Sequence, residues 1–323
     1  MRKIFILTLI SLLIPGIASA GVSFGFINAV KKKVDEIDKK VKNQTPNLVL
    51  LTSFGGTGSG NGQFIMNDGV SNGGVFHDGT NLYVIDQKNY RIQKFDLNNN
   101  FVAWLGAKSA TYSYYTVGVP DTSGMTFGFG AGLFVDNSGN VFGGGGYTIW
   151  RFNSAGSGKT VIGGSYGSIA IDSLNRIIAY AALGDSIKIL NQAGTVLTTF
   201  GGTGSSDGKF NNSGYTGQLV VDSSDNIYAT DTGNSRIQKF DSNGVFLAKW
   251  SAPVYGWSSI AIDTDNNLYT STGDDLRKYS TNGVLLGTWS GASCSGGCKI
   301  AVRNHKFYCV SEFSNTVFIY SIP

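Results

Sequence analysis

The stretch that decides the fold is "LVVDSSDNIYATDTGNSRIQKFDSNGVFLAKW", residues 219–250. It reads as two consecutive β-hairpins, because apolar runs are separated by short clusters of Asp, Asn, Ser and Gly that favour turns. The phrase "FGGTGSSDGKF" (200–210) precedes it, and almost the same phrase, "FGGTGSGNGQF", occupies residues 54–64. A phrase that recurs with its surroundings indicates an internal repeat.

Six lines of the sequence share the first hairpin, an apolar strand followed by a polar turn and a second strand. They are "VFHDGTNLYVID" from Val75, "LFVDNSGNVFGG" from Leu133, "IAIDSLNRIIAY" from Ile169, "LVVDSSDNIYAT" from Leu219, "IAIDTDNNLYTS" from Ile260 and "IAVRNHKFYCVS" from Ile300. A second hairpin follows each of the first five. Four short antiparallel strands in every repeat of roughly 40 residues are typical of β-propeller blades.

The sixth repeat has a third strand, "TVFIYSIP" (316–323), but no fourth strand after it. The segment "NLVLLTSFGG" (47–56) matches fourth strands such as "GTVLTTFGG" (194–202). The N-terminal segment can therefore supply the missing outer strand, which would leave no open edge in the ring. The sequence predicts an all-β, six-bladed β-propeller over residues 47–323, closed by this strand.

Residues 200–250 resemble the NHL repeat, and residues 54–106 resemble it through "FGGTGSGNGQF" and "YVIDQKNYRIQKFD". The resemblance extends over about residues 47–323 and is weakest in the second, third and sixth blades. It implies a six-bladed propeller. The family includes RNA-binding and protein-binding propellers, extracellular sensor domains and a peptide-amidating lyase of related architecture, so the resemblance implies a platform and no single activity.

Residues 1–20 read as a secretory signal peptide, with a basic start, an apolar centre and small residues before an expected cleavage near Ala20. We therefore expect a secreted or periplasmic protein with no membrane span in the mature chain. From residue 43 onward, 17 basic residues face 18 acidic ones, because eight of the 25 basic residues lie in segments 1–20 and 29–42. This near-neutral balance argues against a nucleic acid partner.

Residues 21–46 form a short segment of different character before the propeller. Apolar residues recur at heptad spacing in residues 27–44, with charged residues on the other faces; they are Ile27, Val30, Val34, Ile37 and Val41. The pattern predicts a short amphipathic helix. β-branched residues at both core positions favour a homotrimeric coiled coil, and the alternative is a helix docked against its own propeller.

One polar cluster recurs in the first and fourth blades. It consists of Asp86, Asn89, Arg91, Asp231, Asn234 and Arg236. The cluster could belong to a binding face, or it could hold a loop in place through ion pairs and side-chain-to-backbone hydrogen bonds. Recurrence at equivalent blade positions favours the structural interpretation.

Aromatic residues gather in the connections between blades, above all in the long segment 107–130. The ligand-binding candidates are Tyr112, Tyr114, Tyr115, Phe127, Phe129, Tyr166, Tyr215, Tyr255 and Trp257. Aromatic loops on a rigid scaffold often contact ligands, so these residues could form a platform for sugar rings or a peptide. The alternative is that some of them pack between blades.

The sequence offers few residues for catalysis or metal binding. Only two histidines, His77 and His305, are present, and both fall near turns. We therefore expect no cofactor, no metal and no catalytic residue. The cysteines lie together in the last blade; a Cys294–Cys298 disulfide is the first choice, and Cys298–Cys309 is its rival.

These observations predict a secreted, non-enzymatic recognition protein that presents a loop face to a protein, peptide or glycan partner. One alternative is a propeller lyase or hydrolase with an unrecognised axial site. Another is a structural subunit of a cell-surface assembly.

Overall fold

The computed structural model describes residues 32, 47–66, 74–105, 132–145, 148–156, 158, 160–181, 184–212, 217–255, 258–272, 275–293, 299–311 and 313–323. The chain divides into two units, Met1–Thr45 and Pro46–Pro323. The signal peptide and the amphipathic helix fall in the first unit, of which only Lys32 is described, so both stay predictions. Within the described part of the chain, no helix has the length and apolar character that crossing a membrane requires.

The second unit consists of six four-stranded antiparallel sheets, one for each repeat of the sequence. The innermost strands are β2 (Val75–His77), β6 (Gly132–Val135), β10 (Tyr166–Ile171), β14 (Leu219–Val221), β18 (Ser259–Ile262) and β22 (Lys299–Arg303). The second strands are β3 (Leu82–Asp86), β7 (Val141–Gly145), β11 (Ile177–Ala181), β15 (Ile227–Asp231), β19 (Leu268–Thr272) and β23 (Lys306–Ser311).

The third and fourth strands complete each sheet toward the outside of the ring. The third strands are β4 (Arg91–Phe95), β8 (Thr148–Phe152), β12 (Ser186–Leu190), β16 (Arg236–Phe240), β20 (Asp275–Tyr279) and β24 (Thr316–Ser321). The outer strands are β1 (Val49–Gly55), β5 (Phe101–Leu105), β9 (Thr160–Gly163), β13 (Val196–Gly201), β17 (Phe246–Ser251) and β21 (Leu285–Trp289). Two short 3₁₀ helices, η1 (Gln87–Asn89) and η2 (Thr232–Asn234), lie between second and third strands.

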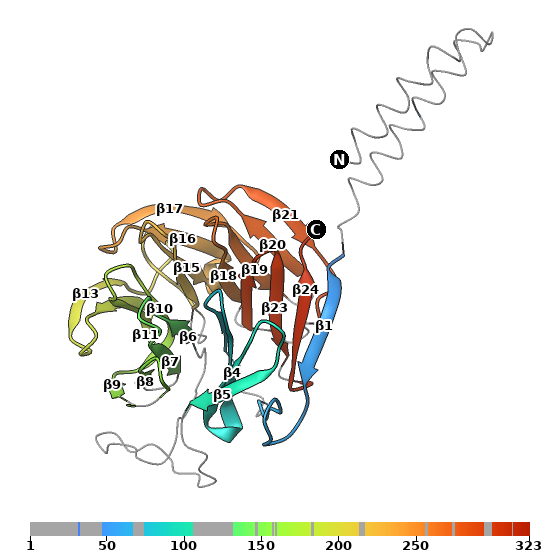
Figure 1. The fold of residues 1–323 in the computed structure, drawn as a ribbon. Coiled ribbons are helices and arrows are strands. Elements are labelled where there is room, and N and C mark those ends of the chain that lie inside the picture. Colours follow the sequence, from blue (N-terminus) through green and yellow to red (C-terminus); the bar gives the residue numbers. More distant parts are fainter. Residues whose placement is uncertain are drawn as a thin grey trace, which may run out of the picture. The chain divides into compact units, whose positions relative to one another are not determined.

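The six sheets form a closed ring, which makes the protein an all-β, six-bladed propeller. Each inner strand contacts the inner strands of both neighbours, and β22 of the last blade contacts β2 of the first. The last sheet has the order β1-β24-β23-β22, so its outer strand comes from the start of the propeller. β1 runs antiparallel to β24, with Val49 opposite Ser321 and Gly55 opposite Thr316. Figure 1 shows blue β1 beside red β24.

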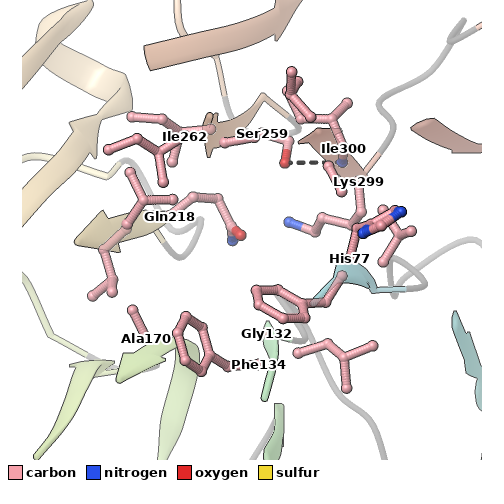
Figure 2. Close-up of a pocket in the computed structure, with 18 of the residues that line it drawn as sticks. His77, Gly132, Phe134, Ala170, Gln218, Ser259, Ile262, Lys299 and Ile300 are labelled. Carbon is pink, nitrogen blue, oxygen red and sulfur yellow. Dashed lines mark hydrogen bonds between the residues drawn. The ribbon is translucent and has the colours of Figure 1, made fainter. Parts of the chain in front are cut away.

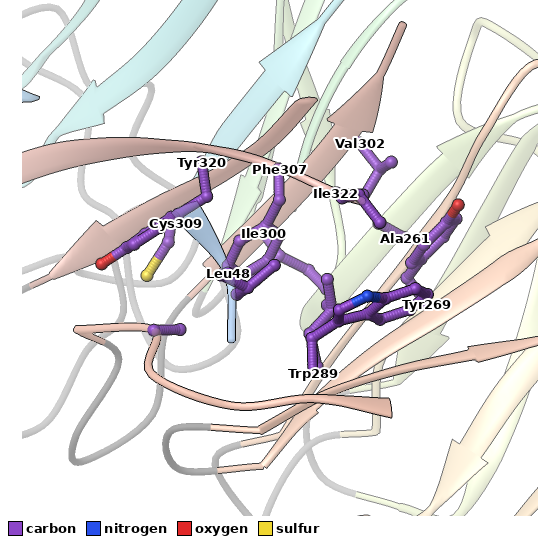
Figure 3. Close-up of a cluster of buried hydrophobic side chains, with 12 residues drawn as sticks. Leu48, Ala261, Tyr269, Trp289, Ile300, Val302, Phe307, Cys309, Tyr320 and Ile322 are labelled. Carbon is purple, nitrogen blue, oxygen red and sulfur yellow. The ribbon is translucent and has the colours of Figure 1, made fainter. Parts of the chain in front are cut away.

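The hydrophobic core is divided into six clusters, and each cluster joins two neighbouring blades. Figure 3 shows the cluster between the fifth and sixth blades, where Tyr269 and Trp289 face Ile300 and Phe307. The cluster that closes the ring packs Val84 of the first blade with Val310 of the last, both fully buried. Because every blade is apolar on both faces, no blade can bury its surface without two neighbours.

The recurring polar cluster holds the glycine-rich phrases against their blades. In the first blade, Asp86 is fully buried, and its Oδ2 accepts a hydrogen bond from Nε of Arg91 at 2.6 Å. Arg91 Nη2 also donates to the carbonyl oxygen of Gly60 at 2.7 Å, and Asn89 donates to that of Gly58 at 3.0 Å. The buried ion pair therefore connects the third strand to the phrase 54–64.

The fourth blade repeats the same contacts. Arg236 Nε donates to Asp231 at 2.6 Å, and its other nitrogens donate to the carbonyl oxygens of Ser205, Ser206 and Lys209. Asn234 donates to Gly204 at 3.0 Å. The two phrases are nearly identical because each must present the same carbonyl oxygens to the same buried pair.

The glycines of the phrases are required by the backbone path at the end of the outer strand. Gly201 has φ +105°, and a Cβ atom there would lie 2.8 Å from the carbonyl oxygen of Asp185. Gly55 has φ +121°, and a Cβ atom would lie 2.7 Å from the carbonyl oxygen of Asn315. Only glycine adopts this conformation without strain and leaves room for the facing carbonyl.

Cys309 lies on β23 with no exposed surface and is disulfide-bonded. Cys294 and Cys298 lie outside the described residues, so the structure does not name its partner. A bond at Cys309 leaves only one of the other two cysteines unbonded within the chain. A bond from Cys309 to either of them would exclude Cys294–Cys298, and Cys298–Cys309 is one of the two pairings that would then be possible; the pairing itself stays a prediction.

Replacing Asp231 with Ala should lower the free energy of unfolding by about 3–5 kcal/mol, because it leaves the buried guanidinium of Arg236 without its counter-charge. Urea unfolding followed by tryptophan fluorescence would measure the change. The matched control is Asp207→Ala, which removes the carboxylate of a pair with Lys249 whose side chains are 53% and 45% exposed. That pair should contribute at most about 1 kcal/mol, and equal losses in both variants would contradict the structural role of the cluster.

Tryptic digestion without reduction should give a cross-linked pair of peptides, residues 279–299 joined to residues 307–323. This result follows if Cys309 is bonded to either Cys294 or Cys298, because trypsin cleaves after Lys278, Lys299 and Lys306. Mass spectrometry before and after reduction would detect the pair. If the two peptides separate without reduction, the bond at Cys309 is ruled out and Cys294–Cys298 becomes the remaining choice.

Candidate functional site

The structure tests only part of the predicted aromatic platform. Seven of the nine candidates lie outside the described residues and stay predictions: Tyr112, Tyr114, Tyr115, Phe127, Phe129, Tyr215 and Trp257. Tyr255 is 60% exposed and so is available to a partner. Tyr166 is only 4% exposed on β10 and packs in the cluster between the second and third blades. The expectation of a surface contact was therefore wrong for Tyr166, which belongs to the core.

A pocket of about 390 Å³ lies on the axis of the ring, where all six inner strands meet. Figure 2 shows residues from different blades pointing into it, including His77, Phe134, Gln218 and Lys299. Its volume is in the range of small-molecule sites. The propeller topology explains its position, because the first strand of every blade lies nearest the axis and the six inner strands together enclose the pocket.

One end of the pocket carries a ring of residues at the beginning of the inner strands. We call this end the connection side, and its ring consists of Gly74, Gly132, Ser168, Gln218, Ser259 and Lys299. In the opposite direction the inner strands run to the turns that join them to the second strands. We call that end the turn side.

The two serines of the connection side use their hydroxyl oxygens to hold the next blade. Ser168 Oγ accepts from the backbone N–H of Leu219 at 3.1 Å, and Ser259 Oγ accepts from that of Ile300 at 3.3 Å. The second contact is drawn in Figure 2. Because each oxygen accepts, each hydroxyl hydrogen remains able to donate to a ligand.

Gln218 and Lys299 add longer side chains to the same end. The Gln218 amide nitrogen donates to the carbonyl oxygen of Gly217 at 3.5 Å, which is the limit of a hydrogen bond. In Figure 2 the Gln218 amide and the Lys299 side chain point toward each other across the open centre of the pocket. The connection side therefore combines hydrogen-bond donors with one positive charge.

The wall of the pocket includes an aromatic pair. The rings of Phe76 and Phe134 have centroids 4.8 Å apart with an interplanar angle of 43°. Both side chains are half-buried and line the pocket. Their exposed ring surface offers apolar contact to the carbon skeleton of a ligand.

The turn side holds His77, Arg303 and Asp263. His77 is 6% exposed, and its Nδ1 accepts a hydrogen bond from the backbone N–H of Gly79 at 2.9 Å. Burial lowers the pKa of His77, and the positive charges of Arg303 and Lys306 lower it further against the opposing effect of Asp78. These effects favour the neutral imidazole, and because Nδ1 accepts a hydrogen bond, the proton of that form lies on Nε2.

Asp263 directs its carboxylate to its own blade. It accepts hydrogen bonds from the backbone N–H and side-chain amide of Asn267 and from the hydroxyl of Tyr269, at 2.8–3.1 Å. No group of three or more His, Cys, Asp or Glu side chains that could hold a metal ion occurs among the described residues. The chemistry that these residues do present is hydrogen-bond donation and positive charge.

Gln218, Lys299 and Arg303 were not among the site residues predicted from the sequence. Alignment of the six lines does contain a signal for them. The position of Arg303 is Asp in the other five lines, and the residue just before each aligned line varies from Gly to Ser, Gln and Lys. Positions that vary while the strand around them stays constant are the ones that a shared scaffold leaves open for binding.

Comparison with known proteins identifies the class. Residues 218–240 match the family model of the NHL repeat, and curated proteins gave no match. A streptogramin B lyase is 16% identical with a TM-score of 0.51, over 80% of this chain and 86% of that chain.

Two further solved structures have similar scores. A catalytically inactive virginiamycin B lyase from Staphylococcus aureus, solved with quinupristin, is 13% identical with a TM-score of 0.53, over 86% of this chain and 99% of that chain. The Cps50 (Swd1) propeller domain of Myceliophteria thermophila is 10% identical with a TM-score of 0.53, over 85% of this chain and all of that chain (100%). At such identities the likeness shows the fold alone. The chain is a six-bladed β-propeller, and its fourth blade carries an NHL repeat.

The pKa of His77 should lie below that of a free imidazole, and Arg303→Gln should raise it, because the variant removes a neighbouring positive charge that disfavours the imidazolium. NMR titration of the ring protons would measure both values, with His305→Gln used to assign the two histidines. Arg151→Gln in the second blade is the control and should leave the titration unchanged. An unchanged pKa in Arg303→Gln would show that Arg303 and His77 do not share one environment.

Proposed function

We propose that this propeller is a non-enzymatic recognition protein that binds its partner at the axial pocket and the surrounding connection side. The observation that carries the proposal is the pocket itself, which all six blades build and which opens among groups able to donate hydrogen bonds. Rigid strands position these groups before a ligand arrives, so little conformational freedom is lost on binding. The partner classes remain those expected from the sequence: protein, peptide or glycan.

The pocket residues support recognition better than catalysis. The hydrogen bonds of Ser168 and Ser259 go to backbone N–H groups, and His77 is held by the backbone of its own turn. A nucleophile needs an adjacent base for activation, and these contacts do not join a serine to His77. The similar solved structures include lyases, so a propeller lyase remains the alternative, to be tested by turnover of a substrate and its loss on chelation.

The remaining expectations from the sequence belong to the same proposal. A cleaved signal at residues 1–20 would export the protein, and self-association through residues 27–44 would present several pockets together. Linked copies strengthen weak binding when their geometry allows simultaneous contact. A pocket of modest volume makes few contacts with a ligand, so several linked copies would compensate for weak binding by each one.

The outer strands favour a second candidate, a structural subunit of a cell-surface assembly. They expose large apolar side chains around the ring, such as Trp104 (42%), Leu197 (53%) and Leu286 (51%). Exposed apolar residues that lie together can mark sites of association. Analytical ultracentrifugation of the purified protein would favour this candidate if a Leu285→Ser/Leu286→Ser variant converts a large species into a monomer or into the small oligomer that residues 27–44 would form.

A mixed glycan and peptide array tests the leading proposal. Labelled protein, residues 21–323, should bind a subset of the array, and Gln218→Ala should weaken this binding by about two- to tenfold, because it removes a hydrogen-bonding group from the pocket. Affinity for each hit would be measured by titration. Circular dichroism would verify that the variants are folded.

Two loop variants provide the comparison. Tyr255→Ala removes an exposed ring, and Tyr112→Ala/Tyr114→Ala/Tyr115→Ala removes the centre of the predicted platform. Loss of binding in the triple variant with full retention in Gln218→Ala would move the site to the loops and overturn the axial pocket. The absence of any hit would shift the assignment to the assembly subunit.

A further inference from the structure

We propose that the axial pocket binds a small organic carboxylate through Arg303 and Lys299, the two ends of strand β22; this inference rests on the proposed function. Both residues line the pocket, one at each end of the same inner strand. Among the described lining residues, the two cations Lys299 and Arg303 both come from the sixth blade.

At position 303 the sixth blade has an arginine where the other five blades have an aspartate, and the turn that follows does not require the arginine. In other blades this aspartate closes the turn; Asp222, for example, accepts from the backbone N–H groups of Ser224 and Asn226 at 2.9 Å. In the sixth blade the turn is closed by Asn304 and His305, which adopt φ of +50° and +57°, with Arg303 opposite Lys306 in the strand register. The arginine is therefore available for another role.

Arg303 differs from the arginines that form close ion pairs within the propeller. Arg91, Arg176 and Arg236 each donate to an aspartate at 2.6 Å. The structure gives Arg303 neither a hydrogen bond nor an ion pair with any residue that it describes. A half-buried guanidinium on the wall of a pocket, with no counter-charge among the described residues, fits an anionic ligand with planar oxygens.

The neighbouring turn leaves room for this guanidinium. A Cβ atom at Gly79 would lie 2.9 Å from Nη2 of Arg303, so the absence of a side chain at this position lets the two approach. His77 lies beside them and adds a neutral N–H donor. The turn at Gly79 therefore leaves space for the Arg303 guanidinium, which lines the pocket.

The other lining groups specify an organic acid rather than a simple ion. Lys299 contributes a second cation, and Gln218 and Ser259 contribute donors at the connection side. The rings of Phe76 and Phe134 offer apolar contact to a carbon skeleton between the two ends. The one described carboxylate in the lining, Asp263, is engaged with its own blade and does not neutralise Arg303.

Binding of two acid probes, each beside a neutral counterpart, tests the proposal. Digalacturonate is compared with its dimethyl ester, and the peptide Ac-Asp-Asp-NH₂ with Ac-Asn-Asn-NH₂, by isothermal titration calorimetry of the full chain at low and high salt. At least one acid should bind about tenfold more tightly than its neutral counterpart and weaken at high salt. The pair that shows the preference identifies the source of the carboxylate as a sugar acid or an acidic peptide.

Charge-removing variants locate the site. Arg303→Gln should weaken the acid about tenfold, and Lys299→Gln should weaken it in the same direction. Lys306→Gln is the matched control, because it removes an equal charge from the exposed side of the same turn, and it should change affinity less than about twofold. Since Arg303 has no described partner to lose, its variant should remain folded, which thermal unfolding would verify.

The outcomes separate this inference from the proposed function. Acid binding no tighter than that of the neutral counterpart, or an equal loss in Lys306→Gln and Arg303→Gln, overturns the carboxylate site. Neutral binding that is sensitive to Gln218→Ala would keep recognition at the pocket while rejecting the carboxylate. Binding that is insensitive to Gln218, Lys299 and Arg303 alike would reject both.

Discussion

Closure of the ring is the constraint on which the rest of the structure depends. Each blade is apolar on both faces and buries them only between two neighbours, so the six clusters of the core exist only if the last blade meets the first. β1 provides this closure by pairing with β24, and the cluster around Val84 and Val310 completes it. A propeller distributes its stability over contacts between neighbours, and an unpaired last blade would leave two faces exposed.

Within the closed ring, repeated local contacts stabilise the scaffold, so the residues that line the axis are not needed for that purpose. The buried pairs Asp86–Arg91 and Asp231–Arg236 use repeated residues to hold two repeated loops. Such contacts stabilise the scaffold without touching the axis. The residues that reach the axis can therefore differ from blade to blade, and the sixth blade uses this freedom to place Lys299 and Arg303 on one strand.

Much of the fold could be predicted from the sequence because short-range sequence patterns specify its strands, turns and repeats. Strand alternation, turn residues and the twin phrases each depend on residues a few positions apart, and together they indicated six blades and the structural character of the polar cluster. The site could be predicted far less well. Tyr166 looked like a loop residue but packs in the core, because its position in β10 turns the ring toward the neighbouring blade.

The sequence by itself determined the blade pattern, the turns and the residues that clamp the loops, since local periodicity and repetition carry that information. Only the tertiary structure decided which side chains share the pocket. His77 and Arg303 come from opposite ends of the propeller sequence, and Gln218 comes from between them, yet all three line one cavity. The physical reason is that a residue on an inner strand meets its functional neighbours only when the ring closes.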